Sequence, residues 1–168
     1  MKKISNQGFT LVELLISVGL ISVILVVSIQ FLLNLVSNSV RIQNRIDVEQ
    51  NANFISAKIT KLISDANSAT LNSSSKVTFI TNGVTYALEL KNGVLYLQNT
   101  LDTSVLASPL NDSSIIISGV NTIPFELSTT TNPQQLKMKL KFEIGSGTNL
   151  GASQNIEKII TIRKSYKN

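Results

Sequence analysis

Residues 2–15 read KKISNQGFTLVELL, a short basic and polar stretch that leads directly into apolar residues. The apolar run that follows has no charged residue from Leu14 to Val40, and Leu, Ile and Val predominate as far as Val36. A helix over residues 14–36 would be about 34 Å long, enough to cross a hydrocarbon layer of about 30 Å. The run therefore predicts a membrane-spanning helix.

Glu13 lies just inside the start of this helix, where a carboxylate is costly. An acid at the middle of a spanning helix raises the free energy of insertion by roughly 2.5–3.5 kcal/mol, and by less near the end. An acidic residue inside a membrane-spanning helix indicates a functional role, so the group that carries the opposite charge has to be identified. A cut between Gly8 and Phe9 would supply that partner, because Phe9 would then carry an ammonium group one helical turn from Glu13.

The residues from Gly8 to Leu15 resemble the prepilin signature of type IV pilins and type II secretion pseudopilins. The resemblance implies that a membrane-embedded prepilin peptidase cuts after Gly8 and methylates the new amine of Phe9. It also implies that Glu13 pairs with the Phe9 amine of a neighbouring subunit in a filament. The alternative is a pair with the amine of its own chain at i, i+4.

Two other interpretations of the N-terminus stay open. In a secretory signal peptide, Ser37-Asn38-Ser39 would be the cleavage site, but the apolar run is longer than such peptides carry. A plain uncleaved anchor would explain the apolar run and leave Glu13 without a role. The prepilin interpretation explains the leader, Gly8, Phe9 and Glu13 together, and we therefore prefer it.

Composition limits the classes of function that remain. The 168 residues suggest one soluble domain and an anchor. The formal net charge is +5, but Lys2 and Lys3 supply two of these charges and would leave with the leader, so a nucleic-acid partner does not follow from charge. The chain has no Cys and no His, which removes disulfides and largely excludes soft metal sites and the usual nucleophile–base pairs. We expect no cofactor, no metal site and no enzymatic activity.

The helix is predicted to continue beyond the membrane. Apolar residues recur from residue 42 to residue 66 mainly at spacings of three and four, with polar and charged residues between them. The predicted apolar stripe comprises Ile42, Ile46, Phe54, Ile55, Ile59, Leu62, Ile63 and Ala66. A single helix from Phe9 to Ala66 would be about 87 Å long. The expected segments are a leader at 1–8, a transmembrane and assembly helix at 9–40, its amphipathic continuation at 41–67, and a β head at 68–168.

After Ser75 the apolar period changes from about 3.6 residues to two, which is typical of strands. Asn82-Gly83 and Asn92-Gly93 separate the first three runs, and Asn-Gly between alternating segments is a strong hairpin signal. Residues 99–112 and 145–153 are expected to be loops. The predicted strands are 77–81, 84–90, 94–98, 115–118, 123–127, 136–144 and 156–163. The fold class is therefore α+β: a long N-terminal helix packed against a C-terminal antiparallel sheet, as in pilins.

Lys137, Lys139 and Lys141 alternate with apolar residues, so in a strand they would share one face. A basic patch for DNA phosphates is one interpretation. A solvated face, or an edge strand protected by charge, is the other. Because no aromatic residues interleave with the lysines as stacking platforms, nucleic acid is not expected among the partners.

Some pseudopilins bind calcium through loops of the head, and Asp102 and Asn111-Asp112-Ser113 lie in polar loops. Calcium takes six to eight oxygen ligands, usually including several carboxylates. Two acids ten residues apart fall short of that set, so no metal site is predicted.

The sequence thus predicts a minor pilin or pseudopilin of a type IV pilus, a type II secretion system or a DNA-uptake pseudopilus. The resemblance implies four partners: other pilin subunits, the prepilin peptidase, an inner-membrane assembly platform and the membrane itself. The N-terminus would start in the cytoplasm with the head outside, before assembly into an extracytoplasmic filament. The alternative is a single-pass envelope protein whose β head binds a ligand and never polymerises.

Overall fold

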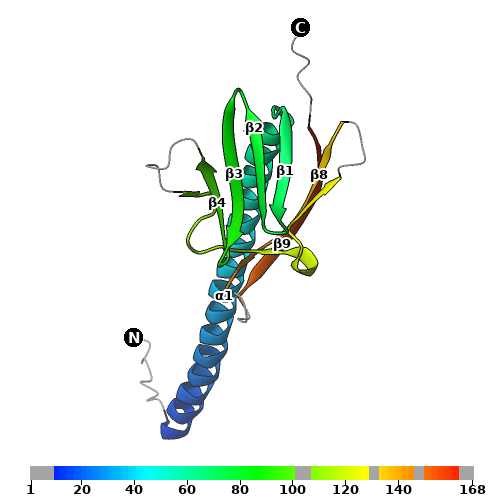
Figure 1. Ribbon diagram of the computed structural model, residues 1–168. Coiled ribbons are helices and arrows are strands. Elements are labelled where there is room, and N and C mark those ends of the chain that lie inside the picture. The colour runs from blue at the N-terminus through cyan, green and yellow to red at the C-terminus, as the bar shows by residue number, and fades with distance from the viewer. Residues whose placement is uncertain (1–9, 101–106, 129–132, 146–149, 163–168) are drawn as a thin grey trace, which may run out of the picture. The chain divides into compact units, whose positions relative to one another are not determined.

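The computed structural model describes residues 10–100, 107–128, 133–145 and 150–162 (Figure 1). The chain divides into two compact units, Met1–Val40 and Arg41–Asn168. The first of the helices and strands is α1 (Leu11–Ser64), a helix of 54 residues that begins in the first unit and ends in the second. The long helix α1 and the antiparallel strands that follow it confirm the predicted α+β fold class.

The first unit contains the apolar part of α1. It is long and apolar enough to cross a membrane, and its large apolar side chains from Leu11 to Val36 are 49–77% exposed. Ser17, Ser22 and Ser28 donate their hydroxyl protons to the carbonyl oxygens four residues earlier, over 2.7–2.8 Å. These hydroxyls therefore need no water, which suits a helix that lies in hydrocarbon.

The second unit buries one face of α1 in the core. The buried helix residues are Val48, Ala52, Ile55, Ser56, Ile59 and Ile63. The predicted stripe is confirmed at Ile55, Ile59, Ile63 and Ala66, all at most 1% exposed. It is wrong at three positions on other faces of the helix: Ile42 (60% exposed), Ile46 (41%) and Phe54 (60%). The physical reason is the turn of about 100° per residue, which places Phe54 a quarter-turn from Ile55.

The first sheet has five strands in the order β1-β2-β3-β4-β5. Their bounds are β1 (Ser68–Ser73), β2 (Lys76–Thr81), β3 (Val84–Lys91), β4 (Val94–Asn99) and β5 (Ser108–Pro109). Figure 1 shows β1 to β4 alongside the part of α1 that belongs to the second unit. Both predicted hairpins are confirmed: Asn82, Gly83, Asn92 and Gly93 have φ of 50–78°, the left-handed conformation that a two-residue type I′ turn requires. Strand β1 was not predicted, because its polar residues look like the end of the helix.

The second sheet is built around β8 (Gln135–Ile144). Strand β9 (Ala152–Thr161) pairs with the whole of β8 on one edge. On the other edge, β6 (Ile116–Gly119) and β7 (Phe125–Ser128) pair with β8 one after the other. The short 3-10 helix η1 (Val120–Thr122) connects β6 and β7. The β part of the fold thus comprises two antiparallel sheets.

Two strands in this sheet begin two or more residues away from the predicted position. The strand expected at 123–127 begins at Phe125, because η1 and Pro124 precede it and proline cannot donate to a ladder. The strand expected at 156–163 begins at Ala152, because β9 follows the full length of β8. Ala152 and Ser153 are therefore strand residues, although they were assigned to a loop. Arg163 lies outside the described residues.

One hydrophobic core joins the helix and both sheets in the second unit. Ile55 and Ile59 from α1 belong to the same buried cluster as Phe79 and Leu88 from the first sheet and Phe142 from the second. All five side chains are at most 1% exposed. Burial on this scale makes the helix face a determinant of head stability.

Truncating a buried helix residue should therefore destabilise the head. We expect Ile59→Ala to lower the free energy of unfolding by about 2–5 kcal/mol, through lost burial and the cavity left behind. Ile42→Ala removes the same atoms from a side chain that is 60% exposed, and it should change stability by less than about 0.5 kcal/mol. Denaturant unfolding of the two variants in detergent micelles measures the difference. Equal effects would show that this face does not hold the head together.

Candidate functional site

The candidate site is the start of α1, where Thr10 and Glu13 bond each other. The amide N of Thr10 donates to Glu13 Oε2 over 3.0 Å, and the Thr10 hydroxyl lies 3.1 Å from the same oxygen. In return, the amide N of Glu13 donates to Thr10 Oγ1 over 3.3 Å. This reciprocal arrangement is a capping box, which satisfies donors that a helix N-terminus leaves without partners.

The capping box gives the Glu13 carboxylate a local role. It is anchored at the positive end of the helix dipole, where a negative charge is stabilised. Two hydrogen bonds to one oxygen reduce the cost of holding the carboxylate in an apolar layer. Sequence reasoning missed this role, although Thr-x-x-Glu before an apolar run is its known signature.

Gly8 and Phe9, the predicted cleavage and methylation positions, lie outside the described residues. The amine that would follow from cleavage is therefore not part of the geometry described above. What the described residues supply is the acceptor side of the predicted charge pair. Glu13 has one oxygen, Oε1, with no hydrogen bond from the described part of the chain.

The three lysines of the predicted basic stripe lie on one face of β8, as expected. The apolar residues between them are buried and the lysines are half-buried. Each lysine has an acidic partner: Lys137 with Glu157, Lys139 with Glu126 at 2.8 Å, and Lys141 with Glu143 at 2.7 Å.

These ion pairs leave little uncompensated positive charge on the face. The hydrogen bond with Glu157 raises the pKa of Lys137 and lowers the pKa of Glu157, so both groups stay charged at neutral pH. A phosphate backbone would have to displace the carboxylates, which weakens the interpretation as a nucleic-acid surface.

The loop residues considered for calcium do not gather into a metal site. Asp112 accepts hydrogen bonds from the amide and the hydroxyl of Ser114, and Asp102 lies outside the described residues. Among the residues that the structure describes, no group of three or more His, Cys, Asp or Glu side chains could hold a metal ion.

Comparison with known proteins gives one match. Residues 4–29 match the model of the prokaryotic N-terminal methylation motif, the prepilin-type signature of type IV pilin and pseudopilin families. The resemblance of the N-terminus is thus confirmed for this segment. No curated protein and no solved structure matches the chain.

The motif and the fold together define a class. A prepilin-type signal, an apolar N-terminal helix and a C-terminal antiparallel β head are the layout of a pilin-like subunit. The motif supports a secreted, structural subunit that is processed by a prepilin peptidase and assembles with other subunits. The signal and the apolar helix fit anchoring in a membrane and a place in a pilus or pseudopilus.

The capping box makes a local prediction. Thr10→Val removes the hydroxyl and should destabilise the first turn by about 1 kcal/mol, equivalent to about fivefold faster exchange of the Glu13 amide proton. Thr10→Ser keeps the hydroxyl and should exchange like the wild type. Hydrogen exchange of the full chain in detergent micelles, followed by NMR, measures both. Unchanged exchange in Thr10→Val would contradict the capping role.

Proposed function

We propose that the protein is a minor pilin or pseudopilin, a structural subunit of a type IV pilus, a type II secretion pseudopilus or a DNA-uptake pseudopilus. The observation that carries this proposal is the methylation motif at 4–29, which extends into the first part of the apolar helix α1. An envelope protein that is only anchored would need the apolar run, but not the Gly8-Phe9 sequence or an acid at position 13.

Processing is the first step of the proposal. The leader Met1–Gly8 is removed on the cytoplasmic side, and the amine of Phe9 is methylated. The mature segments are then an assembly helix at 9–40, its amphipathic continuation at 41–67 and the β head at 68–168. The assembly helix has exposed apolar side chains over its length, which in water would aggregate and in a membrane or a helix bundle are buried.

Assembly uses the charge of Glu13. In the filament, the carboxylate pairs with the Phe9 amine of a neighbouring subunit. The capping box supports this role, because it holds the carboxylate at the helix N-terminus and leaves Oε1 without a donor from the residues that the structure describes. A subunit in the wrong register would leave a charge unpaired in an apolar core, at a cost of several kcal/mol.

The exposed residues beyond the assembly helix extend the contact surface. Ile42 and Ile46 face away from the core of the head, at 60% and 41% exposure. We propose that they pack against helices of adjacent subunits, as a continuation of the apolar segment. This role explains why the apolar pattern of the helix extends further than the head requires.

Detection of the chain in filaments tests the proposal. Filaments sheared from cells that express the protein are washed, dissociated and analysed by mass spectrometry for peptides of the head. Presence of these peptides at a constant ratio to the major subunit supports a pilin role. A chain that stays wholly in the membrane fraction, while filaments form, would favour the anchored, non-polymerising alternative.

A further inference from the structure

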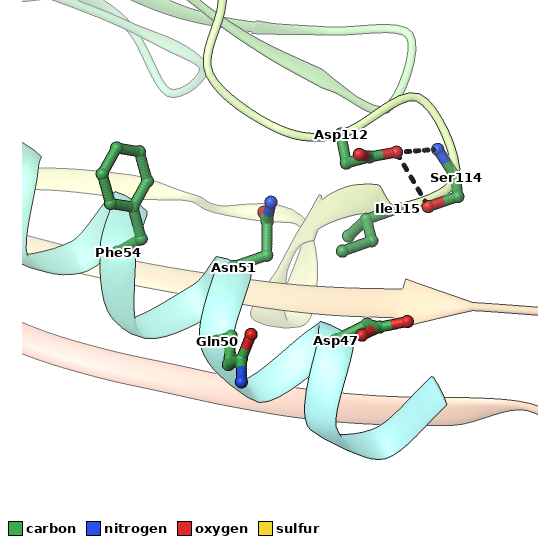
Figure 2. A pocket seen from close by; sticks show the side chains of 7 residues that line it. All are labelled: Asp47, Gln50, Asn51, Phe54, Asp112, Ser114 and Ile115. Carbon is green, nitrogen blue, oxygen red and sulfur yellow. Dashed lines mark hydrogen bonds between the residues drawn. The ribbon is translucent and has the colours of Figure 1, made fainter. Parts of the chain in front are cut away.

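An open pocket of about 430 Å³ lies in the second unit, between α1 and the loop that precedes β6 (Figure 2). Figure 2 shows side chains from the helix on one side and Asp112 and Ser114 from the loop on the other. The residues that line it are Asp47, Gln50, Asn51, Phe54, Asp112, Ser114 and Ile115. None of them belongs to the N-terminal site.

The loop wall of the pocket is held in place by Asn111, which is only 8% exposed. Its Oδ1 accepts the amide proton of Leu95 in β4 over 2.9 Å, and its Nδ2 donates to the carbonyl of Ile115 over 2.6 Å. The loop is thereby tied to the first sheet. A buried and satisfied amide of this kind fixes the position of the neighbouring Asp112.

Asp112 is oriented by Ser114. The amide and the hydroxyl of Ser114 both donate to Asp112 Oδ1, each over 2.9 Å, and these bonds lower the pKa of the carboxyl group. A hydrogen bond from the Ser113 side chain lowers the same pKa further. The pocket thus presents an ionised carboxylate whose position is fixed by the loop.

The helix wall adds further acceptors. Asp47 accepts a hydrogen bond from Gln43 over 2.7 Å, and neither Asp47 nor Asp112 has an ion-pair partner in the described part of the chain. The Oδ1 atom of Asn51 is buried and has no hydrogen-bond partner there either. Leaving a buried polar atom without a hydrogen bond raises the free energy of the folded state. The described residues therefore leave both carboxylates of the pocket without a cationic partner.

An aromatic ring completes the wall. Phe54 is 60% exposed, with Lys58 Nζ at 5.8 Å from the ring centroid. A ring exposed beside two carboxylates suits a cation that is flat, because it can stack on the ring and donate to the acids. The guanidinium group has that shape and five donors.

We propose that this pocket binds an arginine side chain of a neighbouring pilin-like subunit, an assignment of partner that rests on the proposed function. The guanidinium group donates to the carboxylates of Asp112 and Asp47, and its plane lies against Phe54. Rotation of the Asn51 amide brings its unpaired oxygen to a remaining donor. The contact fixes the rotation of one head relative to the next, which the apolar helix contacts do not define by themselves.

Binding is tested on the full chain in detergent micelles, by NMR titration with Nα-acetyl-arginine amide. We expect saturable shifts of the Asn51 and Ser114 amide signals at millimolar probe, and none with the neutral isostere Nα-acetyl-citrulline amide. Asp47→Asn with Asp112→Asn should raise the dissociation constant about tenfold, since two ion pairs are lost. The double control Glu49→Gln with Asp65→Asn removes the same charge outside the pocket and should leave it unchanged.

Three outcomes would overturn the assignment: no saturable shift, equal shifts with the citrulline probe, or calcium chloride shifting the same amides and displacing the arginine probe. Filament incorporation separates this proposal from the proposed function. If the wild type enters filaments and the Asp47→Asn, Asp112→Asn variant enters equally well, the pocket has no part in assembly and the pilin function stands. If the wild type is absent from filaments, the pilin function fails, and the titration alone decides whether the pocket binds a guanidinium group.

Discussion

Glu13→Gln protein is expected to be cut after Gly8, to accumulate in the membrane and to be nearly absent from sheared filaments. Glutamine at this position can still close the capping box with Thr10, so the first turn of α1 should keep its structure. What is lost is the charge that, in the proposed assembly, pairs with the Phe9 amine of the neighbour. Breaking one side of a buried pair costs about 3–5 kcal/mol, which lowers incorporation by about two to nearly four orders of magnitude.

Quantitative mass spectrometry of the membrane and filament fractions measures this effect. Glu49→Gln removes a carboxylate from an exposed position of the same helix and serves as the control; it should enter filaments like the wild type. In a simple anchor, Glu13→Gln would ease membrane insertion and change nothing else. Equal incorporation of Glu13→Gln and wild-type protein would show that the charge pair does not drive assembly.

Substitution of Gly8 by leucine should abolish processing. If the peptidase cuts between Gly8 and Phe9, as proposed, it has to accommodate residue 8 beside that bond, and a large side chain there would exclude the chain from its active site. We expect the full leader to remain on essentially all of the Gly8→Leu protein, with no methyl group on Phe9. Intact-mass measurement of membrane extracts gives both results at once.

Ser5→Leu provides the matched control, because it adds a similar side chain to the leader away from the bond that is cut. It should be processed like the wild type. Processing of Gly8→Leu at the wild-type position would place the recognition determinant elsewhere in the motif.

The local signals in the sequence predicted much of the fold. Asn82-Gly83 and Asn92-Gly93 adopt the left-handed backbone conformation that Asn and Gly favour. The first two hairpins could therefore be predicted from these few residues. The alternation of Lys137 to Lys141 with apolar residues likewise predicted the buried and half-buried faces of β8. Where the spacing of apolar residues is regular and the turn residues are specific, the local sequence is sufficient to predict the strands and the turns between them.

Long-range packing decided the rest. Ile42 and Ile46 fit an apolar stripe at helical spacing, but the head covers the helix only on the face of Val48 and Ile55, and spacing alone does not tell which apolar face is covered. Strand β1 depends on pairing with β2, and the length of β9 depends on β8. Tertiary pairing thus overrides weak local preference.

The two sites differ in how far the sequence predicts them. Glu13 stands out because an acid at the start of an apolar helix is costly, and the capping box could have been found from Thr10 at the right spacing. The pocket at Asp47 and Asp112 has no such signal. Its walls are about 65 residues apart in the chain, and only the packing of the loop on the helix brings them together.

Intact-mass measurement of the wild-type protein, extracted from membranes of cells with an active prepilin peptidase, tests the central claim most directly. A pilin-like subunit processed at Gly8 should have the mass of residues 9–168 plus one methyl group, with the methyl located on the N-terminal Phe9 by fragmentation. A mass that still includes Met1–Gly8, or an N-terminus beyond Ser39, would contradict the account.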